Sequence, residues 1–98
     1  MFARIVKMSF KPSEVEAFKT LFQSKKELIR NFNGCMFLEL YQDKTNTNIF
    51  FTYSYWNTEE DLELYRQSEL FKSVWYETKQ LFNDKPEAWS VDKLVSLP

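Results

Sequence analysis

The sequence predicts an α+β fold: one antiparallel four-stranded sheet of the ferredoxin-like β-α-β-β-α-β order, with helices on one face. Three observations predict it. A chain of 98 residues has the length of one domain, so residues 1–98 form a single unit. Four strand-like segments alternate with two helical stripes in that order. A short polar stretch, residues 43–48, joins the middle two strands as a hairpin.

The first strand covers residues 2–10, where one face carries Phe2, Arg4, Val6, Met8 and Phe10. Lys11 and Pro12 end this strand because proline cannot continue the ladder. Ser13 and Glu16 have the spacing of a helix capping box. Apolar residues at steps of three, four and seven then predict a helix over residues 14–30, which Asn33 and Gly34 terminate.

The hairpin strands are predicted at residues 35–42 and 49–56, and the second of them is aromatic on both faces. Phe51, Tyr53 and Tyr55 fall on one face, whereas Phe50 and Trp56 fall on the other. A strand that is apolar on both faces is covered on both faces. This chain is too short to supply two covering layers. We therefore expect a homodimer formed through the bare face of the sheet.

The second helical region is predicted in two pieces. Thr58 is a candidate N-cap with acidic residues behind it, and Ser68 is a second N-cap. The pattern thus indicates a short helix, a kink near Gln67 and Ser68, and a longer helix to about Asn83. Residues 88–97 predict a fourth strand that bulges or changes face near Lys93.

Composition excludes several classes of function. The net charge is −1, so binding to nucleic acid has little electrostatic support, and no apolar run approaches the roughly 20 residues of a membrane span. The single Cys35 and the lack of a signal-peptide pattern favour the cytoplasm. The chain has no His, which excludes Ser-His-Asp catalysis and His-ligated metal or haem. We therefore predict no metal site.

Aromatic residues of the second helical region suggest a pocket. Aromatics make up 18% of the chain, more than a small core needs. Tyr65, Phe71 and Trp75 either form the roof of an aromatic pocket or pack as plain core. The kink favours the pocket, because two helix segments that meet at an angle leave a cleft against the sheet.

Charged and nucleophilic residues leave further alternatives. Glu39 is a catalytic carboxylate, an ion-pair partner of Arg4 or Lys7, or a residue at the rim of the sheet. Arg66 either meets an anionic ligand at a pocket mouth or forms a surface ion pair with Asp61, Glu63 or Glu69. The acidic residues 59–63 are typical of a solvated helix N-terminus rather than a metal site. Cys35 is expected to be a buried filler.

Four stretches carry a resemblance to a known family: RIVKMSFKP, NFNGC, TYSYWNTEEDLELYRQSELFK and PEAWSV. On these, nearly the whole chain resembles the antibiotic biosynthesis monooxygenase family. The resemblance implies a dimer whose two sheets pack into an α+β barrel, with a pocket in each subunit between helices and sheet. It also implies oxidation of flat phenols, anthrones or hydroquinols by O₂, often without metal or flavin. We therefore expect no cofactor.

The haem-degrading branch of this group differs from this chain at three positions. That branch uses an Asn on the first strand, a Trp on the short helix and a His on the long helix. The matching positions here are Val6, Tyr65 and Trp75, and all three differ. The resemblance therefore does not extend to haem degradation through a His axial ligand.

The expected site follows from the resemblance and the aromatic pattern together. Val6, Trp56, Tyr65, Phe71 and Trp75 are predicted to line a pocket for a small aromatic molecule, with Tyr65 as its main polar contact. Tyr65, Glu39 and Ser54 are the nearest candidates for a proton acceptor. The alternative is a non-catalytic dimeric binding module for a hydrophobic small molecule, which the lack of a clear catalytic base favours.

Overall fold

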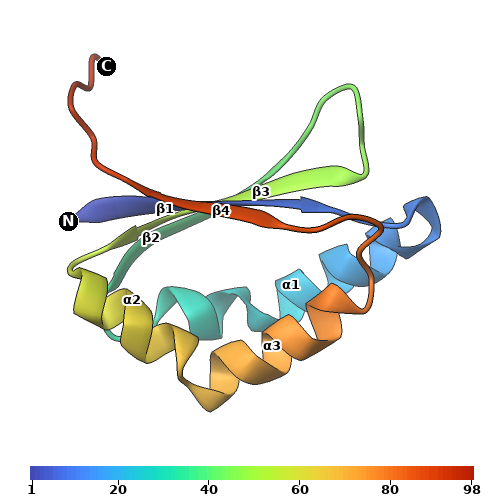
Figure 1. The fold of residues 1–98 in the computed structure, drawn as a ribbon, viewed down its shortest axis with the longest axis horizontal. Coiled ribbons are helices and arrows are strands. Elements are labelled where there is room, and N and C mark those ends of the chain that lie inside the picture. The colour runs from blue at the N-terminus through green and yellow to red at the C-terminus, as the bar shows by residue number, and fades with distance from the viewer.

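A computed structural model describes residues 1–98 and places every helix on one side of a single sheet (Figure 1). Its elements in chain order are β1 (Phe2–Ser9), a 3-10 turn (Pro12–Glu14), α1 (Val15–Arg30), β2 (Cys35–Gln42), β3 (Ile49–Trp56), α2 (Glu59–Arg66), α3 (Glu69–Lys79) and β4 (Glu87–Val91). The strand order is β2-β3-β1-β4 and all three pairings are antiparallel. The predicted α+β ferredoxin-like fold is confirmed. None of the helices combines the length and the apolar character needed to cross a membrane.

The break between α2 and α3 is confirmed at the predicted place. The Thr58 hydroxyl accepts a hydrogen bond from the Asp61 backbone N–H at 3.0 Å and begins α2. The Ser68 hydroxyl accepts one from the Phe71 N–H at 3.1 Å and begins α3. Because each cap satisfies backbone donors that a continuous helix would bond internally, the chain changes direction between them.

The predicted capping box at Ser13 and Glu16 is wrong. The chain makes a 3-10 turn from Pro12 to Glu14, and α1 then begins at Val15 without any side-chain cap. Proline has a fixed φ that suits the first position of a helical turn. Pro12 therefore starts the turn itself, which puts Ser13 inside the turn and not at its cap.

The fourth strand is shorter than the sequence predicts. It spans Glu87–Val91, and residues 92–98 leave the sheet with Leu94, Val95 and Leu97 exposed. The pairing explains this end, because β4 bonds only to β1 and Val91 already lies opposite Ala3. Beyond Ala3 only Phe2 of β1 remains as a partner. Most residues of a strand that continued to residue 97 would therefore have no backbone partner.

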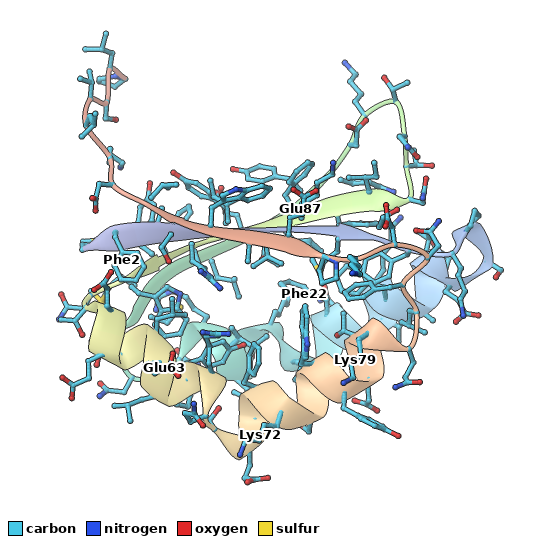
Figure 2. All side chains as sticks on the ribbon, in the orientation of Figure 1. Phe2, Phe22, Glu63, Lys72, Lys79 and Glu87 are labelled. Carbon is cyan, nitrogen blue, oxygen red and sulfur yellow. The ribbon has the colours of Figure 1, made fainter.

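Two separate hydrophobic cores hold the helices on the sheet. The Trp56 core consists of Phe2, Ile29, Cys35, Trp56, Leu62 and Tyr65. The Phe10 core consists of Met8, Phe10, Phe18 and Phe50. Phe22 of α1 packs against both and lies between the helices and the sheet (Figure 2). The interior is therefore closed at two ends and spanned by partly buried rings between them.

The other sheet face carries no helix, and rings project from it (Figure 2). The register puts Tyr53 and Tyr55 of β3 on this face, beside Phe37 of β2 and Trp89 of β4. The rings of Phe37 and Tyr55 stack at 4.7 Å, and the Lys93 ammonium lies 4.7 Å from the centroid of Tyr55. The prediction that β3 is aromatic on both faces is confirmed, and no element of the chain covers this outer face.

Candidate functional site

A cavity of about 260 Å³ lies between the two cores, under the sheet and above α1, α2 and α3. The Trp56 core contributes Trp56, Leu62 and Tyr65 to its wall, and the Phe10 core contributes Met8 and Phe18. Its volume is close to the lower end of the range of about 300–1000 Å³ that is typical of small-molecule sites. The walls are mostly apolar with a few polar groups, which is the composition of such sites.

All five residues predicted to line a pocket border this cavity: Val6, Trp56, Tyr65, Phe71 and Trp75. Four of their rings follow one another without a gap. Trp56 stacks on Tyr65 at 4.9 Å, and Tyr65 meets the edge of Phe71 at 5.2 Å. Phe71 then stacks on Trp75 at 5.8 Å with an interplanar angle of 12°. The structure thus brings the five together, whereas their role in binding stays a prediction.

The break at Ser68 explains how these rings reach one wall. Tyr65 ends the buried face of α2, and the Ser68 cap redirects the chain before Phe71. Phe71 and Trp75 are four residues apart on α3, so they lie on the same side of that helix. A continuous helix would place Tyr65 and Phe71 on different sides, and the row of rings would be interrupted.

The hydroxyl of Tyr65 is a polar group in the helical wall of the cavity. The Tyr65 side chain is buried, and its hydroxyl makes no hydrogen bond within the chain, whereas its backbone oxygen accepts one from the Ser68 hydroxyl. No fully buried side-chain oxygen or nitrogen lacks a hydrogen-bond partner, so the Tyr65 hydroxyl is not sealed from its surroundings, and Tyr65 borders the cavity. Burial raises the pKa of Tyr65 far above its usual value. The hydroxyl therefore stays protonated at neutral pH and offers a donor to a ligand.

Ser54 and Glu39, the other two candidates for a proton acceptor, lie on opposite faces of the sheet. Ser54 lines the cavity, but its hydroxyl already accepts a hydrogen bond from the Trp56 indole at 3.0 Å. The prediction of Glu39 as a site residue is wrong, because Glu39 lies on the outer face of the sheet. There its carboxylate accepts a hydrogen bond from the hydroxyl of Tyr41. It does not pair with Arg4 or Lys7 either. Alternation puts Arg4 on the helix side of the sheet, away from Glu39.

Arg4 lines the cavity and was not among the predicted site residues. It is half-buried, and its Nη1 donates to the Ser90 hydroxyl at 3.0 Å across the β1–β4 pairing. Desolvation lowers the pKa of Arg4 below its usual value, and repulsion from Arg66 adds to this effect. A signal was present in the sequence: Arg4 is the only charge among the apolar residues on its face of the strand.

Arg66 and Cys35 both have partners or surroundings that the sequence predicts. Arg66 borders the cavity and also forms a salt bridge with Glu63 at 3.3 Å, one of the ion pairs predicted for it. Cys35 is buried as expected, and burial raises the pKa of its thiol, which disfavours the nucleophilic thiolate. No group of three or more Cys, Asp or Glu side chains is arranged to hold a metal ion.

Known proteins match this chain at two levels. A family model described as antibiotic biosynthesis monooxygenase matches residues 1–74. A conserved protein of Methanosarcina mazei Go1 has 26% sequence identity and a TM-score of 0.87, with 95% of this chain and 93% of that chain covered. A solved structure described as an antibiotic biosynthesis monooxygenase has 17% identity and a TM-score of 0.90, covering 97% of this chain and 100% of its own.

A Pseudomonas aeruginosa protein is similar at a TM-score of 0.84 and 19% identity, with 96% of this chain and 94% of that chain covered. At identities below 25%, these structures establish the fold and nothing finer. No curated protein matches the sequence. The family model covers about three quarters of the chain, through β1, α1, β2, β3, α2 and the first half of α3.

Proposed function

The chain belongs to the antibiotic biosynthesis monooxygenase family, and from that premise we propose that it oxidises a flat aromatic substrate with O₂ and without a bound cofactor. The substrate class is a phenol, an anthrone or a hydroquinol. One observation carries the proposal: the continuous row of rings from Trp56 to Trp75 that lines a wall of the cavity between sheet and helices. Flat aromatic molecules stack favourably against such rings.

The chemistry needs little from the protein beyond a dry and shaped site. An electron-rich substrate that has lost a proton can itself reduce O₂. A hydroquinol gives two electrons and two protons to O₂, which forms the quinone and hydrogen peroxide. An anthrone takes one oxygen atom at its CH₂ carbon to form the ketone, and the other oxygen leaves as water. The apolar wall excludes water and orients the substrate for this step.

The test is oxygen consumption by metal-free protein with a panel of hydroquinols and anthrones. We expect rates above the autoxidation of each substrate alone, with catalase separating the hydrogen peroxide product from the water product. Rates equal to autoxidation across the panel would contradict the proposal.

The second candidate is a non-catalytic module that binds a hydrophobic small molecule. It is favoured by the lack of a clear catalytic base in the cavity. Tyr65 is a hydrogen-bond donor, the Ser54 oxygen already accepts a hydrogen bond from Trp56, and the chain has no His. Native mass spectrometry of the purified protein separates the two candidates. An aromatic ligand that copurifies and is never converted under air supports the binding module.

Tyr65→Phe is expected to lower kcat/KM about tenfold or more, because a hydrogen bond to a charged oxygen is worth about 1.5–3 kcal/mol. Since burial raises the pKa of Tyr65, wild-type protein should show no loss of rate from its ionisation as pH rises through neutrality. The rate should instead rise with ionisation of the substrate. Tyr76→Phe is the matched control, because Tyr76 is 64% exposed on α3. A Tyr65→Phe variant with unchanged kcat/KM would remove this hydroxyl from the mechanism.

We also propose that the protein is a cytoplasmic homodimer joined through the outer face of the sheet. This face presents Tyr53, Tyr55, Phe37 and Trp89 without cover, and a second copy would bury the same rings by a two-fold axis. The β2–β3 loop and the residues after β4 rise on this side and would flank the partner (Figure 1).

Light scattering is expected to give twice the mass of 11.9 kDa. Tyr53→Glu should shift the protein toward the monomer, because it places an unpaired carboxylate in the interface. Lys72→Glu is the control, since Lys72 is exposed on α3 on the opposite side of the molecule (Figure 2). A wild-type monomer at micromolar concentration would contradict the proposed dimer.

A further inference from the structure

Arg4 borders the cavity and carries a positive charge that forms no salt bridge with any carboxylate of the chain. The chain has two salt bridges, Lys19 to Glu16 and Arg66 to Glu63, and neither involves Arg4. The one side-chain hydrogen bond of its guanidinium goes from Nη1 to the neutral hydroxyl of Ser90 at 3.0 Å. A guanidinium has five N–H donors and stays ionised. Most of these donors are thus free in a partly desolvated place, where an anion is the favoured partner.

The charges around Arg4 do not cancel it. Arg66 borders the same cavity and is near enough to repel the Arg4 charge, whereas Glu63 attracts it. The Arg66–Glu63 pair is about half exposed on both sides, so solvent screens it strongly. Glu87 also borders the cavity but is exposed and forms no ion pair with Arg4.

The uncharged polar groups of the cavity match a ligand oxygen that accepts hydrogen bonds. Tyr65 offers an O–H donor without a partner in the chain. Trp75 borders the cavity, and its indole N–H makes no hydrogen bond within the chain. The Ser54 oxygen is already engaged by Trp56. The inner cavity therefore combines an unpaired cation with donors and a wall of rings.

We propose that Arg4 binds an anionic oxygen carried by an aromatic ring and thereby selects ionised aromatic ligands over neutral ones. The proposal deepens the proposed function, because it names the charge of the ligand in the same cavity. Two kinds of oxygen share this chemistry: a ring carboxylate and an ionised phenol. The volume of about 260 Å³ is close to the lower end of the range of small-molecule sites, so small two-ring probes suit the test.

The test measures the binding of three probes by calorimetry under nitrogen. The probes are 2-naphthoate, its neutral analogue 2-naphthylmethanol, and 2-naphthol at pH values below and above its own pKa. We expect wild-type protein to bind at least one anionic probe about tenfold or more tightly than the neutral alcohol. Arg4→Gln should lose this preference while its affinity for 2-naphthylmethanol stays within about twofold. Arg4→Lys should keep part of the preference, because it keeps the charge and loses the planar fork.

Lys72→Gln is the control, because it removes one positive charge on the far side of α3 and should leave all affinities unchanged. Circular dichroism and light scattering verify that each variant is folded and keeps the assembly of the wild type. Preference for 2-naphthoate assigns the carboxylate, and preference for ionised 2-naphthol assigns the phenolate. Equal affinity for charged and neutral probes, no binding of any probe, or a preference retained in Arg4→Gln would overturn the proposal.

This test is independent of turnover. Binding of anionic probes through Arg4 by a protein that consumes no O₂ would support the role of Arg4 and contradict the oxygenase. Oxidation of neutral hydroquinols at the same rate by wild type and Arg4→Gln would support the oxygenase and contradict the role of Arg4.

Discussion

Trp75→Ala is expected to reduce oxygen consumption to the autoxidation rate of the substrate, a loss of about 100-fold or more in kcat/KM. Trp75 closes the row of rings at its α3 end, where it stacks on Phe71 at 5.8 Å and meets the edge of Phe82 at 5.6 Å. Alanine would remove the stacking surface for a flat substrate and open the cavity to water. Both orientation and desolvation depend on that surface, so the loss should exceed that of one hydrogen bond.

The measurement is the initial rate of oxygen uptake with the most active substrate of the panel, compared with Tyr76→Ala. Tyr76 is the next residue of α3 and is exposed, so its loss should leave the rate unchanged. Trp75 is only half-buried, and its variant should therefore stay folded with the wild-type mass by light scattering. Unchanged turnover in Trp75→Ala would place the reaction outside this cavity.

The elements of this fold could be predicted where local patterns decide them. Alternation locates β2 and β3 at residues 35–42 and 49–56, which are the bounds observed. The two hydroxyl caps at Thr58 and Ser68 locate the break between α2 and α3, because capping is a local interaction. Tyr65, Phe71 and Trp75 follow from that break and from ring spacing, whereas the choice of Val6 and Trp56 also rests on the family resemblance. They could be named without knowing the depth or the shape of the cavity.

Predictions failed where the answer depends on pairing between distant segments. The end of β4 is set by its register on β1, and residues 88–97 carry no sign of that register. The same holds for Glu39, which shares a sheet with Arg4 but lies on the opposite face. Alternation shows which residues of one strand share a face. Which of these faces lies on the helix side of the sheet is decided only when the strands assemble. The unpaired state of Arg4 depends in turn on that assembly.

Phe10→Ala is expected to lower the free energy of unfolding by about 3–5 kcal/mol, the usual cost of removing a fully buried phenylalanine. Phe10 is 0% exposed and is the centre of its core. Its ring stacks on Phe18 at 4.2 Å and lies 5.6 Å from Phe50 and 5.3 Å from Phe82. These partners come from α1, β3 and the segment after α3, so alanine would leave a void that none of them can fill alone.

At about 4–8 °C per kcal/mol for a chain of this size, Phe10→Ala should lower the melting temperature by more than about 12 °C. Thermal unfolding is to be followed at one protein concentration, because a dimer makes the midpoint depend on concentration. Leu28→Ala is the control, since Leu28 is 56% exposed on α1 and should change the midpoint little. A small shift in Phe10→Ala would mean that the Phe10 core is not what closes this end of the cavity. A large shift, beside a Trp75→Ala variant that stays folded, would separate the residues that hold the walls from the residues that contact the ligand.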